Sequence, residues 1–210
     1  MIYLSNLRKQ YNSQLALHIP LLTIDKGIYW LRGPNGSGKT TLLKIIAGII
    51  PFDGEVDYKG INLRKQPLKY RQMIGWSEAE PLFPEFVTGT ELIKLYARIK
   101  QAQGNLVKEL VEMFGMNSYI SQAIRTYSSG MQKKLGIVLA LIGKPDLVIL
   151  DEPLITLDQQ SVNILLELMN DWEKNYGTDF LVSSHVAASA MQTASHKEIL
   201  LTQYSSAYER

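Results

Sequence analysis

Residues 33–41, which read GPNGSGKTT, constrain the fold more than any other part of this sequence. They satisfy the pattern G-x-x-x-x-G-K-[ST] of loops that hold phosphate groups, and we call them the P-loop. An apolar, strand-like stretch ends just before the loop at Leu31, and a helix-like run over residues 41–47 follows it. A strand, a glycine-rich turn and a helix in this order let backbone N–H groups surround an anion at the helix N-terminus. The alternative is a glycine-rich turn that happens to end in Lys-Thr.

The P-loop residues that we expect to contact a nucleotide are Gly33, Pro34, Asn35, Gly36, Ser37, Gly38, Lys39, Thr40 and Thr41. Lys39 can reach the β- and γ-phosphates of a nucleoside triphosphate, and the Thr40 hydroxyl can bind Mg²⁺. Asp151 and Glu152 supply a second acidic element, directly after the apolar run 147–150. Asp151 is expected to hold Mg²⁺ through water, and Glu152 to polarise the attacking water. Taken alone, the pair also fits two solvated carboxylates at a strand end.

Strand-like and helix-like segments alternate along the chain. The strand-like segments are residues 2–4, 15–17, 28–31, 147–150, 180–182 and 199–201; the helical ones are 41–47, 91–100, 106–114, 129–142 and 159–176. This alternation predicts an α/β fold whose P-loop core has a mainly parallel sheet. We expect an N-terminal antiparallel β subdomain before it and a helical subdomain inserted at about 84–143. Asp53-Gly54, between two strand-like pieces, predicts a hairpin turn. With no repeat and no linker-like tract, residues 1–210 are expected to form a single domain.

The composition excludes several classes of protein. Lys and Arg (22) nearly balance Asp and Glu (20), so charge alone does not favour a nucleic-acid partner. The absence of cysteine excludes disulfides and thiolate metal sites. A membrane span needs about 20 apolar residues, and no run here approaches that length. If the protein works at a membrane, we expect it to do so through a partner.

A segment shortly before the acidic element extends the pattern. Tyr127-Ser128-Ser129-Gly130-Met131 stands where the ATP-binding cassette (ABC) ATPases have their signature segment, usually Leu-Ser-Gly-Gly-Gln. Together with the P-loop and the acidic element, it makes nearly the whole chain resemble that family. The resemblance implies that Ser128, Ser129 and Gly130 meet a γ-phosphate at a helix N-terminus. Taken alone, the same residues fit a simple helix N-cap.

Three further positions match the family in order and spacing. His185 resembles the switch histidine that contacts the γ-phosphate, and Asp158 resembles the residue that touches the opposite subunit. Tyr11, well upstream of the P-loop, resembles the aromatic residue that stacks on adenine. For Tyr11, a surface tyrosine in a turn is the alternative.

One departure lies after the strand-like residues 74–76. The family often has a glutamine there that senses Mg²⁺ and the membrane partner, and this sequence has Ala79. Alanine can neither donate, accept nor bind a metal. Glu78 or Glu80 are candidates to substitute, and the sequence does not select between them.

The resemblance implies an ATP-binding, ATP-hydrolysing subunit that uses Mg²⁺ and powers a separate integral membrane permease. It implies a head-to-tail homodimer, or a pseudo-dimer with a second cassette, in which residues 128–130 of one subunit close the P-loop site of the other. Such a subunit works at the cytoplasmic face of the cell membrane as a peripheral protein. The Glu-x-Glu-Pro-like loop at residues 78–81 slightly favours an exporter; the substrate is not encoded in these motifs.

Three alternatives belong to other classes. A soluble ABC ATPase of repair or translation would usually carry a coiled-coil insertion or a duplicated cassette. A small-molecule P-loop kinase would account for Lys39 and Asp151 but leaves the signature segment, His185 and Asp158 unexplained. A regulatory cassette that binds ATP without hydrolysing it is disfavoured by Glu152 and His185, whereas Ala79 and Met131 keep it open.

Overall fold

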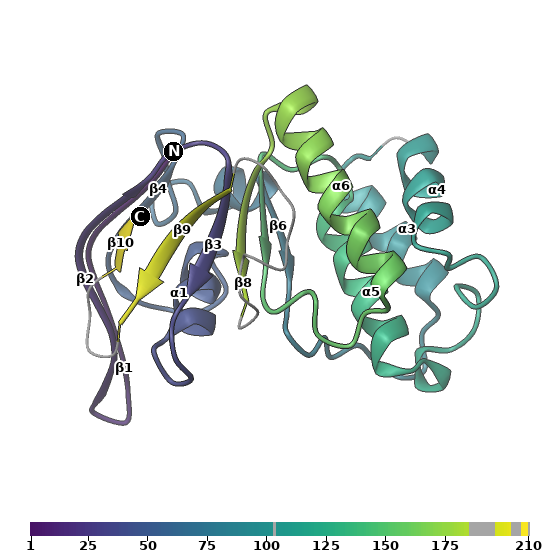
Figure 1. Cartoon of the computed structure of the whole chain (residues 1–210), viewed down its shortest axis with the longest axis horizontal. Coiled ribbons are helices and arrows are strands. Elements are labelled where there is room, and N and C mark those ends of the chain that lie inside the picture. Colours follow the sequence, from purple (N-terminus) through teal and green to yellow (C-terminus); the bar gives the residue numbers. More distant parts are fainter. Residues whose placement is uncertain (103, 185–195, 203–206, 210) are drawn as a thin grey trace.

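A computed structural model describes residues 1–102, 104–184, 196–202 and 207–209. Figure 1 shows a four-stranded antiparallel sheet at one end, a six-stranded sheet in the middle and a group of helices at the other end. The predicted α/β class, with an N-terminal antiparallel β unit, a mainly parallel sheet and inserted helices, is confirmed. In the described part of the chain, no helix has both the length and the apolar character that crossing a membrane demands.

The antiparallel sheet has the order β2-β1-β4-β5. Its strands are β1 (Ile2–Tyr11), β2 (Gln14–Ile24), β4 (Asp53–Tyr58) and β5 (Ile61–Asn62). Asn12 and Ser13 join β1 to β2 as a two-residue turn, both with positive φ (44° and 66°), as the favoured hairpin turns require. This hairpin sets Tyr11 directly opposite Gln14.

The prediction of a hairpin turn at Asp53-Gly54 is wrong. The pair begins β4, which runs antiparallel to β1 with Asp53 opposite Arg8. Gly54 has a φ of 99°, and a Cβ there would lie 2.3 Å from the Asn6 carbonyl oxygen. Glycine is therefore needed here because β4 and β1 come close together. That contact joins residues far apart in the sequence.

The central sheet has the order β10-β9-β3-β8-β7-β6, in which only β10 runs antiparallel to its neighbour. Its strands are β3 (Ile28–Arg32), β6 (Ile74–Ser77), β7 (Leu147–Leu150), β8 (Asp179–Ser183), β9 (His196–Leu201) and β10 (Ala207–Glu209). The register places Ser77 beside Leu150, and Leu31 beside Ser183. The carboxyl ends of β3, β6, β7 and β8 therefore meet at one edge, where the segments that follow them come together.

The helices cover the sheet on both faces. They are α1 (Lys39–Ile46), α2 (Pro67–Gln72), α3 (Gly89–Ile99), α4 (Gly104–Met113), α5 (Ser129–Leu141) and α6 (Gln159–Tyr176), with a 3₁₀ turn at Ile124–Thr126. The predicted helices 91–100, 106–114, 129–142 and 159–176 are confirmed within two residues at each end. Gly177 ends α6 with a φ of 66°, in the left-handed region that glycine adopts readily.

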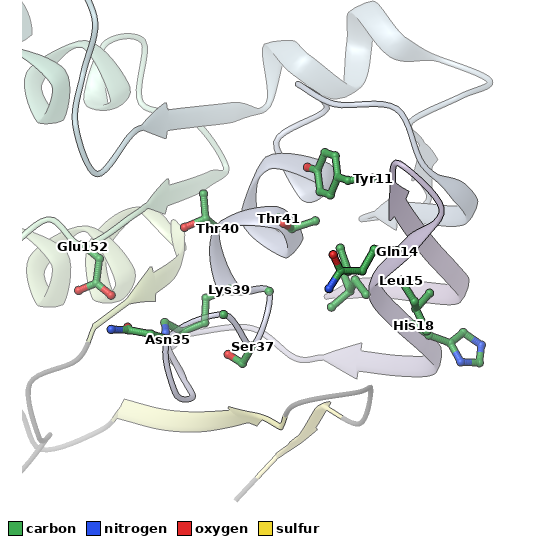
Figure 2. Close-up of a pocket in the computed structure, with 14 residues that line it drawn as sticks. Tyr11, Gln14, Leu15, His18, Asn35, Ser37, Lys39, Thr40, Thr41 and Glu152 are labelled. Carbon is green, nitrogen blue, oxygen red and sulfur yellow. The ribbon is translucent and has the colours of Figure 1, made fainter.

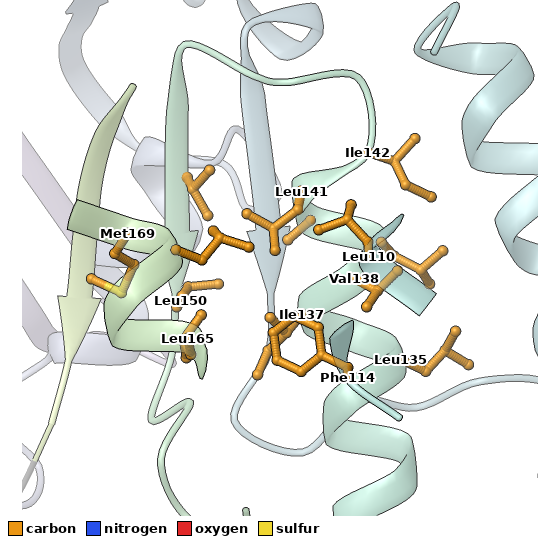
Figure 3. Packing of buried hydrophobic residues seen from close by; sticks show 14 of the residues in the cluster. Leu110, Phe114, Leu135, Ile137, Val138, Leu141, Ile142, Leu150, Leu165 and Met169 are labelled. Carbon is orange, nitrogen blue, oxygen red and sulfur yellow. The ribbon is translucent and has the colours of Figure 1, made fainter. Parts of the chain in front are cut away.

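Two hydrophobic cores lie on the two faces of the central sheet. One, formed with α1 and the antiparallel sheet, takes Tyr29 and Leu181. The other, formed with α3, α4, α5 and α6, takes Trp30 and Val182, because successive side chains of a strand point to opposite faces. Figure 3 shows the second core, where side chains from β7, α5 and α6 and from the end of α4 meet. Strand β7 is buried on both faces, which explains its unbroken apolar run.

Candidate functional site

A pocket of about 520 Å³ opens at the carboxyl edge of the central sheet. That volume lies within the range of small-molecule sites, about 300–1,000 Å³. Figure 2 shows the P-loop running through the middle of the pocket, with Glu152 at one end and Tyr11 at the other. The predicted site residues that line it are Tyr11, Asn35, Gly36, Ser37, Gly38, Lys39, Thr40, Thr41 and Glu152.

The P-loop backbone is shaped for close approach. At Gly33 a Cβ would lie 2.3 Å from the Leu201 carbonyl oxygen and 2.6 Å from Ser37 Oγ, so no other residue fits. Gly38 caps α1 with a φ of 95° and contributes no side-chain hydrogen bond, and the first turn of α1 has no acidic residue. The helix N-terminus therefore faces the pocket without an anion of its own. Ser37 Oγ is buried with no hydrogen-bond partner among the described residues.

Lys39 lies beneath the loop rather than in solvent. Its Nζ donates to the carbonyl oxygens of Gly33 (2.8 Å) and Pro34 (3.2 Å). Burial lowers the pKa of the Lys39 ammonium, and the negative charges of Glu152 and Asp151 act in the opposite direction. The site thus holds a poorly hydrated cation that can pair with a phosphate group. The two carboxylates beside it would repel such an anion unless a metal cation offsets their charge.

Asp151 and Glu152 follow β7 and are both held by Ser183 of β8. The Ser183 hydroxyl donates to Asp151 Oδ1 (2.6 Å) and accepts from the Glu152 N–H (2.8 Å). Asp151 Oδ2 is buried and has no partner among the described residues. Thr40, whose side chain is exposed, lines the pocket, whereas Asp151 does not. The unpaired Asp151 oxygen and the Thr40 hydroxyl are hard oxygen donors of the kind that Mg²⁺ requires.

Tyr11 lies at the far end of the pocket from Glu152. It ends β1 and is 48% exposed, so one face of its ring remains accessible. The Lys9 ammonium lies 4.8 Å from the ring centroid. Tyr11 can therefore offer a stacking surface beside the P-loop, at the opposite end of the pocket from Glu152.

The signature residues lie at the start of α5 and do not line the pocket of their own chain. Ser128 is the N-cap, and its Oγ accepts from the Met131 N–H at 3.3 Å. Ser129 and Ser128 are exposed. A Cβ at Gly130 would lie 2.9 Å from the Thr156 carbonyl oxygen, so α5 begins closely packed against the chain before α6.

Asp158 and His185 complete the predicted set. Asp158 caps α6, accepts from the Ser161 N–H (2.8 Å) and pairs with Lys134 of α5 (2.8 Å). Lys134 and the Ser161 N–H hold the pKa of this carboxyl well below its usual range. Asp158 therefore joins the signature helix to α6 and lies outside the pocket. His185 falls outside the described residues.

The sequence matches the profile of the ABC transporter family over residues 21–155, more than half of the chain. The chain belongs to the ABC transporter family. It is 30% identical over 197 residues to the uncharacterized ABC transporter ATP-binding protein YcbN of Bacillus subtilis (strain 168), covering 92% of this chain and 64% of that protein. The bacitracin transport ATP-binding protein BcrA of Enterococcus faecalis is 31% identical over 197 residues, with the same coverage of both chains. The chain thus spans less than two thirds of these two relatives.

A solved structure of an ATP-binding subunit of an ABC transporter superimposes with a TM-score of 0.85. The two chains are 28% identical, and the match covers 96% of this chain and 85% of that one. The nucleotide-binding fold of the ABC family therefore extends over nearly the whole chain.

Ala79, which replaces the glutamine common in ABC proteins, contributes its backbone instead of a side chain. Its carbonyl oxygen accepts a hydrogen bond from Lys133. Glu78 forms an ion pair with Lys44 of α1 (3.3 Å), and neither Glu78 nor Glu80 lines the pocket. In this structure neither glutamate takes the place of the missing amide.

Sequence reasoning missed several residues of the site. Five from β2 line the pocket beside Tyr11, namely Gln14, Leu15, Ala16, Leu17 and His18. The sequence did contain a signal for these residues. Strand-like segments lie on both sides of Asn12 and Ser13, and a two-residue turn there places the second strand beside Tyr11. Ser183 is not part of any motif that the sequence shows, because its bonds to Asp151 and Glu152 depend on the pairing of β7 with β8. Lys133 carries no motif that would have indicated its burial.

Proposed function

We propose that this chain is the ATP-binding and ATP-hydrolysing subunit of an ABC transporter and that it powers a separate integral membrane permease. The observation that carries the proposal is the pocket itself, with Lys39 at its centre, Glu152 at one end and Tyr11 at the other. Asp151 does not line the pocket, but its negative charge acts on Lys39. This arrangement suits a base at Tyr11 and a triphosphate along the P-loop. The whole of residues 1–210 would act as one ATP-binding domain, with residues 84–143 as its helical subdomain.

Hydrolysis in this proposal follows from the positions of four side chains. Glu152 holds the attacking water and takes its proton as the water attacks the γ-phosphorus. The opposite bond, from that phosphorus to the β–γ bridging oxygen, breaks in line, which leaves ADP and inorganic phosphate. Lys39 leaves the loop carbonyls and neutralises charge on the β- and γ-phosphates. Thr40, and Asp151 through water, would hold Mg²⁺, which when bound would supply further positive charge to the phosphates.

The site is completed by a second subunit in this proposal. Ser128, Ser129 and Gly130 begin a helix whose N-terminus is exposed, yet they do not line the pocket of their own chain. A head-to-tail homodimer, or a pseudo-dimer with another cassette, would bring this N-terminus to the γ-phosphate held by the other subunit. His185 would contact the same phosphate, and Asp158 would lie near the subunit boundary.

A second, apolar groove supports the permease as partner. This groove, of about 450 Å³, is lined on its apolar side chiefly by Trp76, Pro81, Phe83 and Leu139. Leu82 also lines the groove and is 90% exposed. Exposure of an apolar side chain to water is unfavourable, and a docked segment would bury it. The groove begins at the end of β6, the same sheet edge that carries Glu152. We propose that a cytoplasmic segment of the permease binds here, which places the chain at the cytoplasmic face of the membrane.

The direction of transport is proposed from a single loop. The loop at residues 78–81 resembles that of exporters, and we propose export on that basis. The BcrA relative is a bacitracin transport protein by name. The alternative function is a soluble or regulatory ABC ATPase. Ala79 favours this alternative, because the glutamine that in the family often senses the membrane partner is missing.

The test is steady-state ATP hydrolysis by the purified chain, together with its ATP affinity. Lys39→Ala should weaken ATP binding and abolish turnover, because no other cation lines the pocket among the described residues. Lys44→Ala is the matched control, one turn further along α1 and outside the pocket, and should keep both values. Wild-type binding and turnover in Lys39→Ala would remove Lys39 from the site. Binding without turnover in the wild type would favour the regulatory alternative, and failure to co-purify with a membrane protein would favour the soluble one.

A further inference from the structure

Lys133 of α5 is a buried ammonium in an unusual setting. It is 2% exposed, and its Nζ donates to three backbone carbonyl oxygens, those of Glu78 (3.2 Å), Ala79 and Glu152 (3.2 Å). Burial lowers the pKa of the Lys133 ammonium, and the negative charges of Asp151 and Glu152 oppose that shift. A buried cation costs free energy unless its hydrogen bonds are satisfied, so three carbonyls around one ammonium form a built contact.

The backbone that Lys133 holds is itself strained. Glu152 has a φ of 45°, the left-handed region that residues with a Cβ rarely adopt. Such a conformation persists only where the surroundings fix it, and strain of this kind gathers at functional sites. Here the Glu152 N–H donates to Ser183 Oγ, and the Glu152 carbonyl accepts from Lys133. The residue is therefore held on both sides of its Cα.

We infer that Lys133 is a positioning residue for ATP hydrolysis, which holds the main chain of Glu152 in the conformation that directs its carboxylate at the attacking water. The inference rests on the proposed function, because it assigns Lys133 a role only through Glu152. Lys133 does not line the nucleotide pocket, so it acts on the step that Glu152 performs and leaves nucleotide binding alone.

Lys100 provides a matched comparison within the same chain. Its Nζ also donates to three backbone carbonyls, those of Arg71 (2.8 Å), Gln72 (3.2 Å) and Ile74 (2.7 Å). Burial lowers the pKa of the Lys100 ammonium as well. These carbonyls lie at the amino end of β6, away from the edge that carries the site. Lys100 thus makes the same kind of carbonyl contacts away from the site, although it is partly buried where Lys133 is fully buried.

The experiment compares Lys133→Met with Lys100→Met in the full chain, by ATP affinity, kcat and the midpoint of urea unfolding. Methionine keeps an unbranched side chain only one heavy atom shorter than that of lysine and removes the donors. Lys133→Met should leave the Kd for ATP within about threefold and lower kcat at least tenfold. Lys100→Met should lower the unfolding midpoint and keep kcat. If Lys133→Met does not fold, Lys133→Gln, which keeps N–H donors at a shorter reach, is measured in its place with the same expectation.

A second measurement separates positioning from general damage. If Lys133 acts through Glu152, adding Lys133→Met to Glu152→Gln should lower the residual single-turnover rate no further, because both changes disable one function. An equal fall in both backgrounds, or a wild-type kcat in a folded Lys133→Met, would overturn the inference. Absence of hydrolysis in the wild type would instead overturn the proposed function, so the two failures are distinguishable.

Discussion

Placing a negative charge at Ser129 tests whether the signature helix meets a nucleotide held by a second subunit. Ser129 is the first residue of α5 and is exposed, and the cap is made by its neighbour Ser128. An aspartate in this first turn interacts favourably with the helix dipole, by roughly 0.3–1 kcal/mol, so Ser129→Asp should not harm folding. Gly130 is a poorer position, because any Cβ there would meet the Thr156 carbonyl oxygen at 2.9 Å.

In the proposed dimer the new carboxylate would face a γ-phosphate. Two unit negative charges about 5 Å apart repel by about 3 kcal/mol at an effective dielectric constant near 20. That is roughly a hundredfold in an equilibrium constant for each of the two sites of a symmetric dimer. Ser129→Asp should therefore keep the ATP affinity of the monomer and lose ATP-dependent dimerisation and turnover.

The control for this charge is Ser129→Asn, which has the same shape without the carboxylate. ATP affinity is measured by titration, the dimer fraction by light scattering and turnover by phosphate release. A Ser129→Asp protein that dimerises and hydrolyses ATP as Ser129→Asn does would show that this helix end is only a capped terminus.

Two further substitutions test other parts of the account. Tyr11→Ala should weaken ATP binding about tenfold, the lower end of the stacking range because the ring is half exposed, and should leave tripolyphosphate binding unchanged; equal losses for both ligands would contradict stacking on the base. Asp158→Asn keeps a good N-cap and removes the charge paired with Lys134, so at pH 7 the free energy of unfolding should fall by at most about 1 kcal/mol, because water screens an exposed pair. Since the pKa of Asp158 is depressed in the folded state, this contribution is present above the unfolded pKa of about 3.9 and is lost as the pH falls from there toward the folded pKa. Urea titrations measure the difference in unfolding free energy between the wild type and Asp158→Asn. A difference that stays constant from pH 7 to pH 3 would refute the pairing.

The parts of the fold predicted from sequence are those whose signals are local. The P-loop carries its glycines, its lysine and its flanking strand and helix within a short segment, and α6 covers the residues 159–176 that its helical pattern predicts. The buried strand β7 is an unbroken apolar run. In each case a few consecutive residues contain the whole physical reason for the structure.

The parts that failed depend on contacts between distant segments. Gly54 has the positive φ of a turn residue, yet it lies in β4, where the strand comes too close to β1 for a side chain. Ser183 reaches Asp151 only because β8 pairs with β7, and β2 reaches the pocket only through its hairpin with β1. Lys133 looks like a surface lysine in the sequence, and its burial follows from how α5 packs beside β6 and β7. Pairing and packing of this kind leave no mark within a single motif.

Glu152→Gln tests the central claim most directly, because it separates binding from chemistry in one protein. Glutamine keeps the shape and hydrogen-bonding capacity of Glu152 and loses the carboxylate that accepts a proton. We predict that the variant binds ATP, that its turnover falls by roughly 10²–10⁴, as expected on loss of a general base, and that light scattering shows an ATP-bound dimer that accumulates. Turnover equal to the wild type, or a variant that stays monomeric in saturating ATP, would contradict the account.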